Sequence, residues 1–492
     1  MPKQGDHVKM CDSSRRAVLT RERLDSCLEL IRQQYEMDSR PWVVGYSGGK
    51  DSTCLLQLVW RALASLPSDH LKKPVYLISS DTFVESPAVE QHLAKSLELI
   101  RVAARDACLP LEVYKVGPLV DDSFWVNLIG RGYPAPYSSF RWCTDRMKIQ
   151  PATAFIRRKV AEYGEVIVLL GARKSESATR AQVMSHRREV GDRLFRHSSL
   201  PNAWVFTPIE DWSTQDIWTY LTSVSSPWGS DNLELVTMYR NAQAGECPLV
   251  IDKSTPACGG GRFGCWVCTV VDRDRTMEAM IDNGEMWLQP LLDFRNWLAG
   301  TRDPDRKAAI RETRRRTGRI EFFGPDTDRK LRHGPFKLDF RKEILERLLT
   351  TQRAAREKGP DPEVKLIRED ELHKIRQLWL HEEGDWEDSL PAIYEQVMEE
   401  RLDWLDDDLS GMGGAEKAVL DDVTRECKVP AGLLVELMDV EREYHGMSRR
   451  AGVYEQLNRV LKKDWRSLDE AWASQQAANG KLLAPEEKAR AH

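Results

Sequence analysis

The fold of this chain is decided by ten residues, Val43-Val44-Gly45-Tyr46-Ser47-Gly48-Gly49-Lys50-Asp51-Ser52. A short apolar strand, Trp42 to Tyr46, leads into a Ser-Gly-Gly-x-Asp-Ser loop, and a helix with apolar Leu55 and Leu56 follows it. Two adjacent glycines let backbone amides approach a phosphate closely, and the helix N-terminus adds further donors and the positive end of its dipole. The pattern therefore predicts a phosphate-binding loop between a strand and a helix.

We expect six consecutive residues of this loop to bind the nucleotide: Ser47, Gly48, Gly49, Lys50, Asp51 and Ser52. The two serines add hydroxyl donors and Lys50 adds a positive charge, while Asp51 orients the loop or holds Mg2+ on the phosphates. We assign Lys50 and Asp51 a catalytic role. The spacing differs from Gly-x-x-x-x-Gly-Lys-Ser/Thr, which disfavours γ-phosphate transfer of the kinase or GTPase type.

Strands and helices alternate on both sides of the loop. We expect further strands at Pro74 to Ser79, Leu111 to Val116, Val166 to Gly171 and Val205 to Ile209, and helices at Ala17 to Met37, Pro87 to Ala107 and Asp211 to Leu221, the last with Ser213 as its N-cap. Apolar strands separated by helices are typical of a mostly parallel sheet that is covered on both faces. The sequence therefore predicts an α/β nucleotide-binding architecture.

The composition suits several globular domains, because 41% of the 492 residues are hydrophobic and 30% are charged. No apolar run approaches the ~20 residues that span a bilayer, and residues 1–37 lack the apolar stretch of a secretory signal. We therefore expect a cytoplasmic protein without membrane contact. The predicted segments are an N-terminal helical segment at 1–40, a nucleotide-binding domain at 41–232, a cysteine-rich segment at 233–275, a charged helical region at 276–410 and a C-terminal helical module at 411–492.

Four of the ten cysteines lie in a glycine-rich loop with the spacing C-x10-C-x6-C-x2-C: Cys247, Cys258, Cys265 and Cys268. Cysteines of a cytoplasmic protein are kept reduced, so their clustering points to metal or sulfur chemistry rather than disulfides. Four thiolates suit either tetrahedral zinc or a cubane iron-sulfur cluster, and buried cysteines without a ligand are the remaining alternative.

Cys143 lies among the cations Arg141, Arg146 and Lys148, which lower the pKa of a thiol and raise its thiolate fraction. It is a candidate persulfide carrier, an alternative cluster ligand, or a core thiol. Four further cysteines lie in or beside helical apolar patterns and are interpreted as small core residues: Cys27, Cys54, Cys108 and Cys427. Cys11 lies in a polar stretch and is given no role.

Charged residues follow two of the predicted strands, at the edge where open α/β sheets bind ligands. Arg173, Lys174 and Arg180 surround Glu176, and the two arginines suit a triphosphate or a nucleic-acid phosphate. The alternative is a solvated helix start with a Glu176–Arg180 pair. Asp81, after the second strand, is expected to help place magnesium or the ribose.

Two neighbouring stretches carry opposite charge. Residues 301–360 contain 18 basic and 10 acidic residues, a net charge of +8, and residues 361–410 have a net charge of about −12. This is compatible with a nucleic-acid face beside an acidic partner face, and equally with solvated helical surfaces. Arg314 to Arg316, with Arg311 and Arg319, are a candidate DNA-backbone contact or an ordinary basic helix face.

Several motifs together resemble a known family. Ser47 to Ser52 is similar to the pyrophosphatase loop (PP-loop) of the adenine nucleotide α-hydrolase-like superfamily. Later motifs resemble its PAPS reductase-like branch: Ser80-Asp81-Thr82 through Glu85, Arg141-Trp142-Cys143-Thr144-Asp145-Arg146-Met147-Lys148, Gly171-Ala172-Arg173-Lys174-Ser175-Glu176-Ser177 with Arg180, and Pro208-Ile209-Glu210-Asp211-Trp212. Within that branch, about residues 40 to 275 resemble the DndC-type sulfurtransferases of DNA phosphorothioation.

The resemblance implies a PP-loop ATP pyrophosphatase that cleaves ATP between the α and β phosphates, with Mg2+, and adenylates the DNA backbone before sulfur is inserted. It also implies a [4Fe-4S] cluster on the four clustered cysteines, a cysteine desulfurase as sulfur donor and further subunits of a modification complex. Reductases carry two adjacent cysteines where this chain has Trp142-Cys143. The alternatives are an APS or PAPS reductase, a tRNA thiolation enzyme, or a scaffold that binds nucleotide and DNA without turnover.

Overall fold

The computed structural model describes residues 19–176, 181–182, 184, 193–242, 264–325, 329–402, 414–427, 429–444 and 451–476. The chain forms two compact units. The sheet unit comprises Met1–Asp81, Glu85–Gly117 and Thr144–Gly264, and the helical unit comprises Thr82–Val84, Pro118–Cys143 and Cys265–His492. Each unit thus combines segments that are distant in the sequence, whereas the five predicted segments are continuous, and their boundaries remain a prediction.

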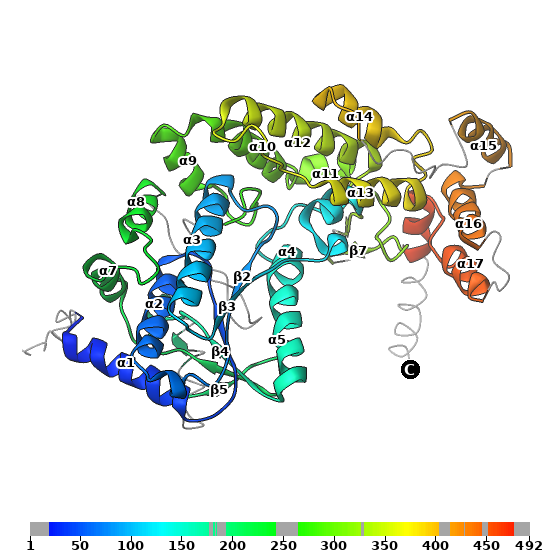
Figure 1. The fold of residues 1–492 in the computed structure, drawn as a ribbon. Coiled ribbons are helices and arrows are strands. Elements are labelled where there is room, and N and C mark those ends of the chain that lie inside the picture. Colours follow the sequence, from blue (N-terminus) through cyan, green and yellow to red (C-terminus); the bar gives the residue numbers. More distant parts are fainter. Residues whose placement is uncertain are drawn as a thin grey trace, which may run out of the picture. The chain divides into compact units, whose positions relative to one another are not determined.

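The sheet unit is built on a six-stranded sheet with the order β3-β2-β1-β4-β6-β5 (Figure 1). Its strands are β1 Trp42–Gly45, β2 Val75–Ser80, β3 Leu111–Val116, β4 Val166–Leu169, β5 Phe195–Arg196 and β6 Ala203–Phe206. All neighbours pair in parallel except β5, which is antiparallel to β6 at the edge. In the register of the central strands, Trp42 of β1 lies opposite Val75 of β2 and Ile167 of β4.

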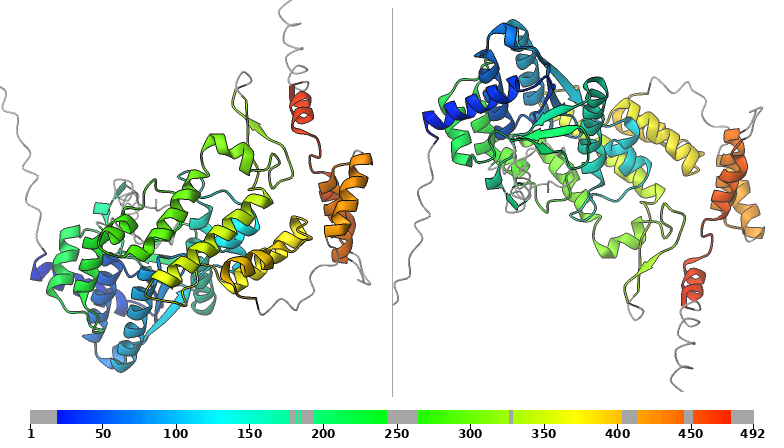
Figure 2. Two further views of the ribbon diagram at one scale, coloured as in Figure 1. Left: turned by 90° about the horizontal axis from the view of Figure 1, so that it is seen from above. Right: turned by 90° about the horizontal axis from the view of Figure 1, so that it is seen from below.

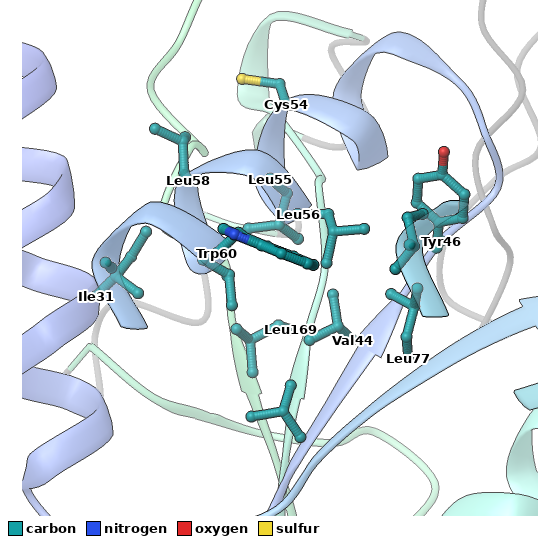
Figure 3. Close-up of a cluster of buried hydrophobic side chains, with 14 of the residues drawn as sticks. Ile31, Val44, Tyr46, Cys54, Leu55, Leu56, Leu58, Trp60, Leu77 and Leu169 are labelled. Atoms are coloured by element: carbon teal, nitrogen blue, oxygen red, sulfur yellow. The ribbon is translucent and has the colours of Figure 1, made fainter. Parts of the chain in front are cut away.

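Helices cover both faces of this sheet, because successive strand residues point to opposite faces and both faces are apolar. Val44 packs with Leu55 of α2, and Val43 packs with Phe155 of α5 on the other face. Figure 3 shows side chains of α2 above Val44, Leu77 and Leu169 of three strands. The helices of the unit are α1 Arg21–Glu36, α2 Lys50–Ala64, α3 Pro87–Asp106, α5 Gln150–Tyr163, α7 Thr214–Ser223 and α8 Asn232–Ala242, with short turns at Ser68–His70, Asp145–Ile149 and Lys174–Glu176.

The helical unit contains α9 Arg275–Asp282, α10 Gln289–Gly300, α11 Pro304–Ile310, α12 Leu338–Lys358, α13 Glu369–Glu382, α14 Ser389–Met398, α15 Gly414–Cys427, α16 Ala431–Tyr444 and α17 Val453–Leu461 (Figure 2). A hairpin of β7 Phe322–Phe323 and β8 Lys330–Leu331 lies between α11 and α12, and short turns occur at Val120–Asp122, Val126–Gly130 and Met286–Leu288. The short helix α4, Trp142–Thr144, lies at the point where the chain returns to the sheet unit. Across the described residues, no helix has the length and apolar character needed to cross a membrane.

The predicted fold class is confirmed: a mostly parallel sheet with helices on both faces precedes a helical C-terminal region. Ser213 is the N-cap of α7, where its hydroxyl accepts from the N–H of Asp216 at 3.1 Å. The expected strand at Val205 to Ile209 is shifted, because β6 ends at Phe206 and Pro208 has no N–H to donate to a ladder. The short hairpin of β7 and β8 interrupts the predicted helical region at 276–410.

Candidate functional site

The phosphate-binding loop joins β1 to the first turn of α2 in the sheet unit. Gly48 has a φ of +70°, and a Cβ added there would lie 3.1 Å from Leu93 Cδ1, so this turn favours glycine. Ser52 Oγ donates to the carbonyl of Gly49 at 3.0 Å and lies 3.1 Å from Ser47 Oγ. The two predicted serines therefore close the loop against the start of α2.

Asp51 is held between two cations. Lys50 Nζ lies 2.9 Å from one carboxylate oxygen, and Arg173 Nε donates to the other. Arg173 follows β4, is fully buried, and also donates to Ser175 Oγ at 2.7 Å. The close approach requires Gly171, because a Cβ there would lie 2.9 Å from the Asp51 backbone. The geometry gives Arg173 a positioning role on Asp51, and its direct contact with a triphosphate remains a prediction.

Helix α8 adds a residue to which the sequence patterns assigned no role. The Tyr239 hydroxyl accepts from the backbone N–H of Lys50 at 3.2 Å, and Lys50 Nζ lies 5.6 Å from the centre of its ring. Amides in the first turn of a helix are the donors that a phosphate oxygen uses. The phenol oxygen therefore occupies one position that a nucleotide phosphate can take. The two residues are 189 apart in the sequence, and no local pattern predicts their contact.

The charged residues after β4 pair differently from the prediction. Lys174 Nζ lies 2.6 Å from Asp211 Oδ1 and 3.4 Å from Glu210 Oε1, and thus pairs with the carboxylates that follow β6. Glu176 is almost fully buried and its carboxylate lies 4.0 Å from Arg173 Nε. Arg180 lies outside the described residues. Of the three cations predicted around Glu176, the structure thus places Arg173 beside it. The position of Arg180 remains a prediction.

Carboxylates gather after β2, at the edge where the phosphate-binding loop lies. Asp81 pairs with Lys115 at 2.9 Å and Glu85 pairs with Lys148 at 3.8 Å. Burial raises the pKa of Glu90 on α3, and the charge on Asp81 raises it further. Within the described ranges no three His, Cys, Asp or Glu side chains are arranged to hold a metal ion. The magnesium role of Asp51 and Asp81 therefore remains a prediction.

Two of the four clustered cysteines form a turn in the helical unit. The N–H of Cys268 donates to the carbonyl of Cys265 at 3.0 Å, and both side chains are partly exposed. Behind the turn, the buried Arg295 of α10 donates to the carbonyls of Cys268 at 2.9 Å and Asp272 at 2.8 Å, and to that of Val271. These hydrogen bonds from a buried guanidinium fix the backbone of the turn and of the residues that follow it.

The segment that carries Cys143 shares its support with the cysteine turn. Trp142 Nε1 donates to the carbonyl of Pro134 at 3.0 Å, and Thr269 Oγ1 donates to the carbonyl of Pro136 at 2.7 Å. Pro134 to Pro136 thus holds both the residue before Cys143 and the residue after the turn. This segment belongs to the helical unit and has no pattern that marks it as functional.

A row of aromatic rings connects the same two segments. Trp142 stacks on Phe124 with ring centres 5.4 Å apart, Phe124 packs against Trp125 at 5.0 Å, and Trp125 packs against Trp266 at 6.0 Å. Trp142 precedes Cys143 and Trp266 follows Cys265 in the sequence. Because ring packing restricts both neighbours, Cys143 and the cysteine turn are attached to one rigid core.

The residues at this turn fit a thiolate-bound metal group. Cys265 and Cys268 supply two sulfur ligands in a turn of the type that zinc and iron-sulfur sites use, and Arg295 compensates negative charge. Cys247 and Cys258 lie outside the described residues. The four-cysteine set, and the choice of [4Fe-4S] over zinc, therefore remain predictions.

The other cysteines divide into two groups. Cys27 and Cys54 are buried in the core of the sheet unit, and burial raises the pKa of Cys27 to about 12, which confirms them as core residues. Cys108 and Cys427 are exposed, so the core prediction is wrong for both. Cys108 follows the end of α3 with a φ of +51°, beyond the apolar face of that helix. Cys11 lies outside the described residues.

The basic and acidic stretches pair with one another inside the helical unit. Among the described residues the ion pairs that join them include Arg341–Glu383 at 2.8 Å, Lys342–Asp385 at 2.9 Å and Arg353–Glu399 at 3.1 Å. Part of the alternation of charge along the sequence is therefore neutralised within the unit. Arg341 and Asp385 are buried in these pairs, whereas Arg353 and Glu399 remain exposed to solvent, and a nucleic-acid face stays a prediction.

The arginine run follows α11 and is not helical, so its interpretation as a basic helix face is wrong. Arg314 lies over the Trp465 ring at 4.3 Å and Arg316 over the Tyr133 ring at 5.3 Å. Both guanidinium groups thus have intramolecular partners. Their contact with DNA remains a prediction that the geometry does not favour.

Comparisons with known proteins give a family for part of the chain. Residues 41–270 match the family model for the phosphoadenosine phosphosulfate (PAPS) reductase domain. A curated relative, an uncharacterised protein of Methanocaldococcus jannaschii, is 26% identical over 262 residues, which are 53% of this chain and 43% of the relative. The chain thus spans less than half the length of the curated relative that it matches.

Two solved structures have a weak similarity. FMN adenylyltransferase of Candida glabrata, in complex with FAD and inorganic pyrophosphate, is 15% identical with a TM-score of 0.24, over 40% of this chain and 55% of that one. The U34-tRNA thiolase NcsA of Methanococcus maripaludis, with its [4Fe-4S] cluster, is 12% identical with a TM-score of 0.27, over 57% and 80%. These TM-scores are too low to say anything about the function of this chain.

The family match agrees with the parallel sheet and with the phosphate-binding loop after β1. Residues 41–270 are therefore similar to a PAPS reductase domain of the PP-loop ATP pyrophosphatase superfamily, and their sheet has the adenine nucleotide α-hydrolase-like fold.

Proposed function

We propose that this protein is an ATP-dependent sulfurtransferase that converts a phosphate of the DNA backbone into a phosphorothioate. The observation that carries the proposal is the phosphate-binding loop, in which Gly48 turns the backbone and Asp51 is held between Lys50 and Arg173. The PAPS reductase-like domain supports nucleotide-dependent chemistry that involves sulfur. The choice of DNA rests on the resemblance of the motifs to DndC-type enzymes.

In this proposal the loop binds the pyrophosphate part of ATP. The amides at the start of α2 and the hydroxyls of Ser47 and Ser52 donate to phosphate oxygens, and Lys50 compensates the charge that develops on the leaving pyrophosphate. Asp51, oriented by Arg173, holds Mg2+ on the phosphates, and Asp81 helps to place the metal or the ribose. Only cleavage between the α and β phosphates leaves pyrophosphate in this loop.

The proposed reaction has two transfer steps. A non-bridging oxygen of the DNA phosphate attacks the α-phosphorus of ATP, the bond to the β-phosphate breaks, and pyrophosphate leaves. The DNA phosphate is then joined to AMP. Hydrogen sulfide anion attacks the DNA phosphorus, AMP leaves with the attacking oxygen, and the sulfur takes its place. The oxidation state of sulfur does not change, so the two steps need no oxidant.

The sulfur chemistry is proposed for the four clustered cysteines and Cys143. Cys247, Cys258, Cys265 and Cys268 would hold a [4Fe-4S] cluster, which would supply a binding site for sulfide. Cys143 is the proposed carrier, because the aromatic row and Pro134 to Pro136 attach it to the same core as the cysteine turn. If sulfur arrives as a Cys143 persulfide, a second thiol must release it and forms a disulfide with Cys143.

The proposal includes partners. A cysteine desulfurase supplies the sulfur, because no pattern in this chain suggests a pyridoxal site, and further subunits of a modification complex bring the DNA. Arg314 and Arg316 do not support a direct DNA contact, because each lies over an aromatic ring. In this proposal the DNA-binding surface therefore includes other subunits of the complex.

The products of the reaction test this function. The protein, the desulfurase with cysteine, ATP and Mg2+ are incubated with duplex DNA, with tRNA, and with adenylylated or phosphoadenylylated sulfate. Mass spectrometry of digested nucleic acid detects a phosphorothioate linkage or a thiolated base, and a separate assay detects sulfite. We expect phosphorothioate in DNA together with AMP and pyrophosphate.

Other outcomes identify the alternatives. Thiolated base in tRNA would identify a tRNA thiolation enzyme, and sulfite would identify a reductase. Binding of ATP and DNA without AMP formation would identify a scaffold.

A further inference from the structure

A three-residue segment of the second nucleotide motif reaches the cysteine turn. Thr82–Val84 lies between Asp81 and Glu85, yet these three residues belong to the helical unit. Thr82 is fully buried, and its hydroxyl oxygen lies 3.4 Å from the sulfur of Cys265, within hydrogen-bonding distance. The sequence patterns predicted a nucleotide role for this motif and no contact with a cysteine.

The backbone fixes the same contact independently. The N–H of Trp266, the residue after Cys265, donates to the carbonyl of Val84 at 3.0 Å. One hydrogen bond thus joins the backbones of the two segments, and the Thr82–Cys265 contact joins their side chains. The position of the Cys265 sulfur relative to the Thr82 hydroxyl is therefore set by two contacts.

Phe83, which lies between Thr82 and Val84, is held by its surroundings. Phe83 has a φ of +60°, a left-handed conformation that is rare for an aromatic residue, and the Arg368 guanidinium lies 3.6 Å from the centre of its ring. Arg368 is the N-cap of α13. The backbone conformation of Thr82–Val84 is unfavourable for Phe83 on its own. Packing inside the helical unit therefore fixes it.

The chemistry of this contact follows from the state of the sulfur. A thiolate can only accept a hydrogen bond, so the Thr82 hydroxyl must donate when Cys265 is ionised or bound to a metal. An O–H donor withdraws electron density from the sulfur and restricts its rotamer. The first effect makes a free thiolate a weaker nucleophile, and hydrogen bonds to ligand sulfurs also set the reduction potential of a cluster.

We propose that Thr82 is a positioning residue of the sulfur site, whose hydroxyl donates to the sulfur of Cys265 and holds it in place. The inference rests on the proposed function only in assigning Cys265 to that site. Thr82 acts through Cys265 and contacts neither the nucleotide nor the DNA in this proposal.

Alkylation of the thiol tests the contact without any cofactor. Full-length protein is reduced, freed of metal with a chelator, and treated with iodoacetamide at a pH high enough to ionise ordinary cysteines. Peptide mass spectrometry then gives the rate at Cys265. We expect Thr82→Val to react several-fold faster than wild type, because the isosteric change removes only the donor, and Thr82→Ser to keep the wild-type rate.

Two controls separate the contact from loosening of the turn. Thr269→Val removes the hydroxyl that donates to the carbonyl of Pro136, so it should leave the rate at Cys265 unchanged. Cys268 serves as an internal reference, because its rate should be the same in wild type and Thr82→Val. Equal rates at Cys265 in all variants would overturn the proposal. So would an equal acceleration of Cys265 and Cys268 in Thr82→Val.

A second readout applies to cluster-loaded protein. The reduction potential should fall in Thr82→Val and stay at the wild-type value in Thr82→Ser, since loss of a donor to a ligand sulfur favours the oxidised cluster. An unchanged potential in Thr82→Val would contradict the proposal. Failure of the wild-type protein to form AMP and pyrophosphate would instead refute the proposed function, while the alkylation result would still decide the role of Thr82.

Discussion

The phosphate-binding loop and the cysteine turn compensate their buried charges differently. In the sheet unit the charged groups of the phosphate-binding loop pair with one another, as Asp51 does with Lys50 and Arg173. In the helical unit the buried Arg295 is bonded to backbone carbonyls beside the cysteine turn. The first arrangement orients side chains before an anionic nucleotide arrives, and the second fixes the backbone that carries Cys265 and Cys268. The difference suggests a division between nucleotide activation and sulfur handling, which variants in each unit can test.

The largest expected effect is in the sheet unit. Ser47→Ala and Asp51→Ala should each lower pyrophosphate release by about 100-fold or more, because a preorganised donor or the metal-orienting carboxylate is lost. A coupled pyrophosphate assay measures this, and the iron content should stay at the wild-type value. Asp106→Ala, which removes an exposed carboxylate at the end of α3, is the matched control. Undiminished release in both loop variants would remove the loop from the mechanism.

The next effect separates the two steps. Cys143→Ser should retain pyrophosphate release and iron but lose phosphorothioate formation, since only sulfur transfer needs a thiolate there. Digestion and mass spectrometry of the DNA measure the product. Cys108→Ser removes an exposed thiol of the sheet unit and serves as control. If Cys143→Ser loses iron while Cys247→Ser retains it, Cys143 is the fourth ligand and Cys247 is the free thiol.

The third prediction concerns the iron content of the protein, which should depend on the cysteine turn. Anaerobically prepared wild-type protein should be brown and hold about four iron atoms per chain, as expected for a cubane cluster. Cys265→Ser should weaken metal binding by about 10-fold to 100-fold, because a serine oxygen is a harder ligand for this site. Iron analysis is the measurement, with exposed Cys427→Ser as control. Colourless protein with about one zinc per chain would show that the metal was predicted wrongly.

The smallest expected effect concerns Tyr239. Its hydroxyl accepts from the N–H of Lys50, which a phosphate oxygen needs, so Tyr239→Phe should tighten ATP binding by up to about 5-fold, the equivalent of one net hydrogen bond. Titration calorimetry with ATP and Mg2+ measures the change. Weaker binding in Tyr239→Phe would mean instead that the hydroxyl contacts the nucleotide itself.

The comparison of the units also explains what the sequence could predict. The strands, the loop and the Ser213 cap follow from patterns within a few neighbouring residues, and the structure confirms them. The contacts of Arg173 with Asp51, of Tyr239 with Lys50 and of Thr82 with Cys265 join residues 122, 189 and 183 positions apart. No local period or propensity encodes such contacts, because they arise only when the elements pack.

The helical unit is harder to predict from the sequence, because it is assembled from segments that are far apart in the chain. Its short segments Thr82–Val84 and Pro118–Cys143 lie inside the sequence of the predicted nucleotide-binding domain. Arg314 and Arg316 suggested a nucleic-acid contact, and the aromatic rings that they cover come from distant parts of the chain. Charge counted along a sequence does not reveal which charges are already paired.

The central claim is that the phosphate-binding loop joins AMP to an oxygen of the DNA phosphate. Tracing that oxygen tests the claim most directly. DNA with heavy oxygen in its non-bridging positions is incubated with the protein, its sulfur donor, ATP and Mg2+, and the nucleotide products are analysed by mass spectrometry. The account predicts AMP that carries one heavy oxygen, in step with phosphorothioate formation. Phosphorothioate formed with unlabelled AMP, or with ADP and phosphate, would contradict it.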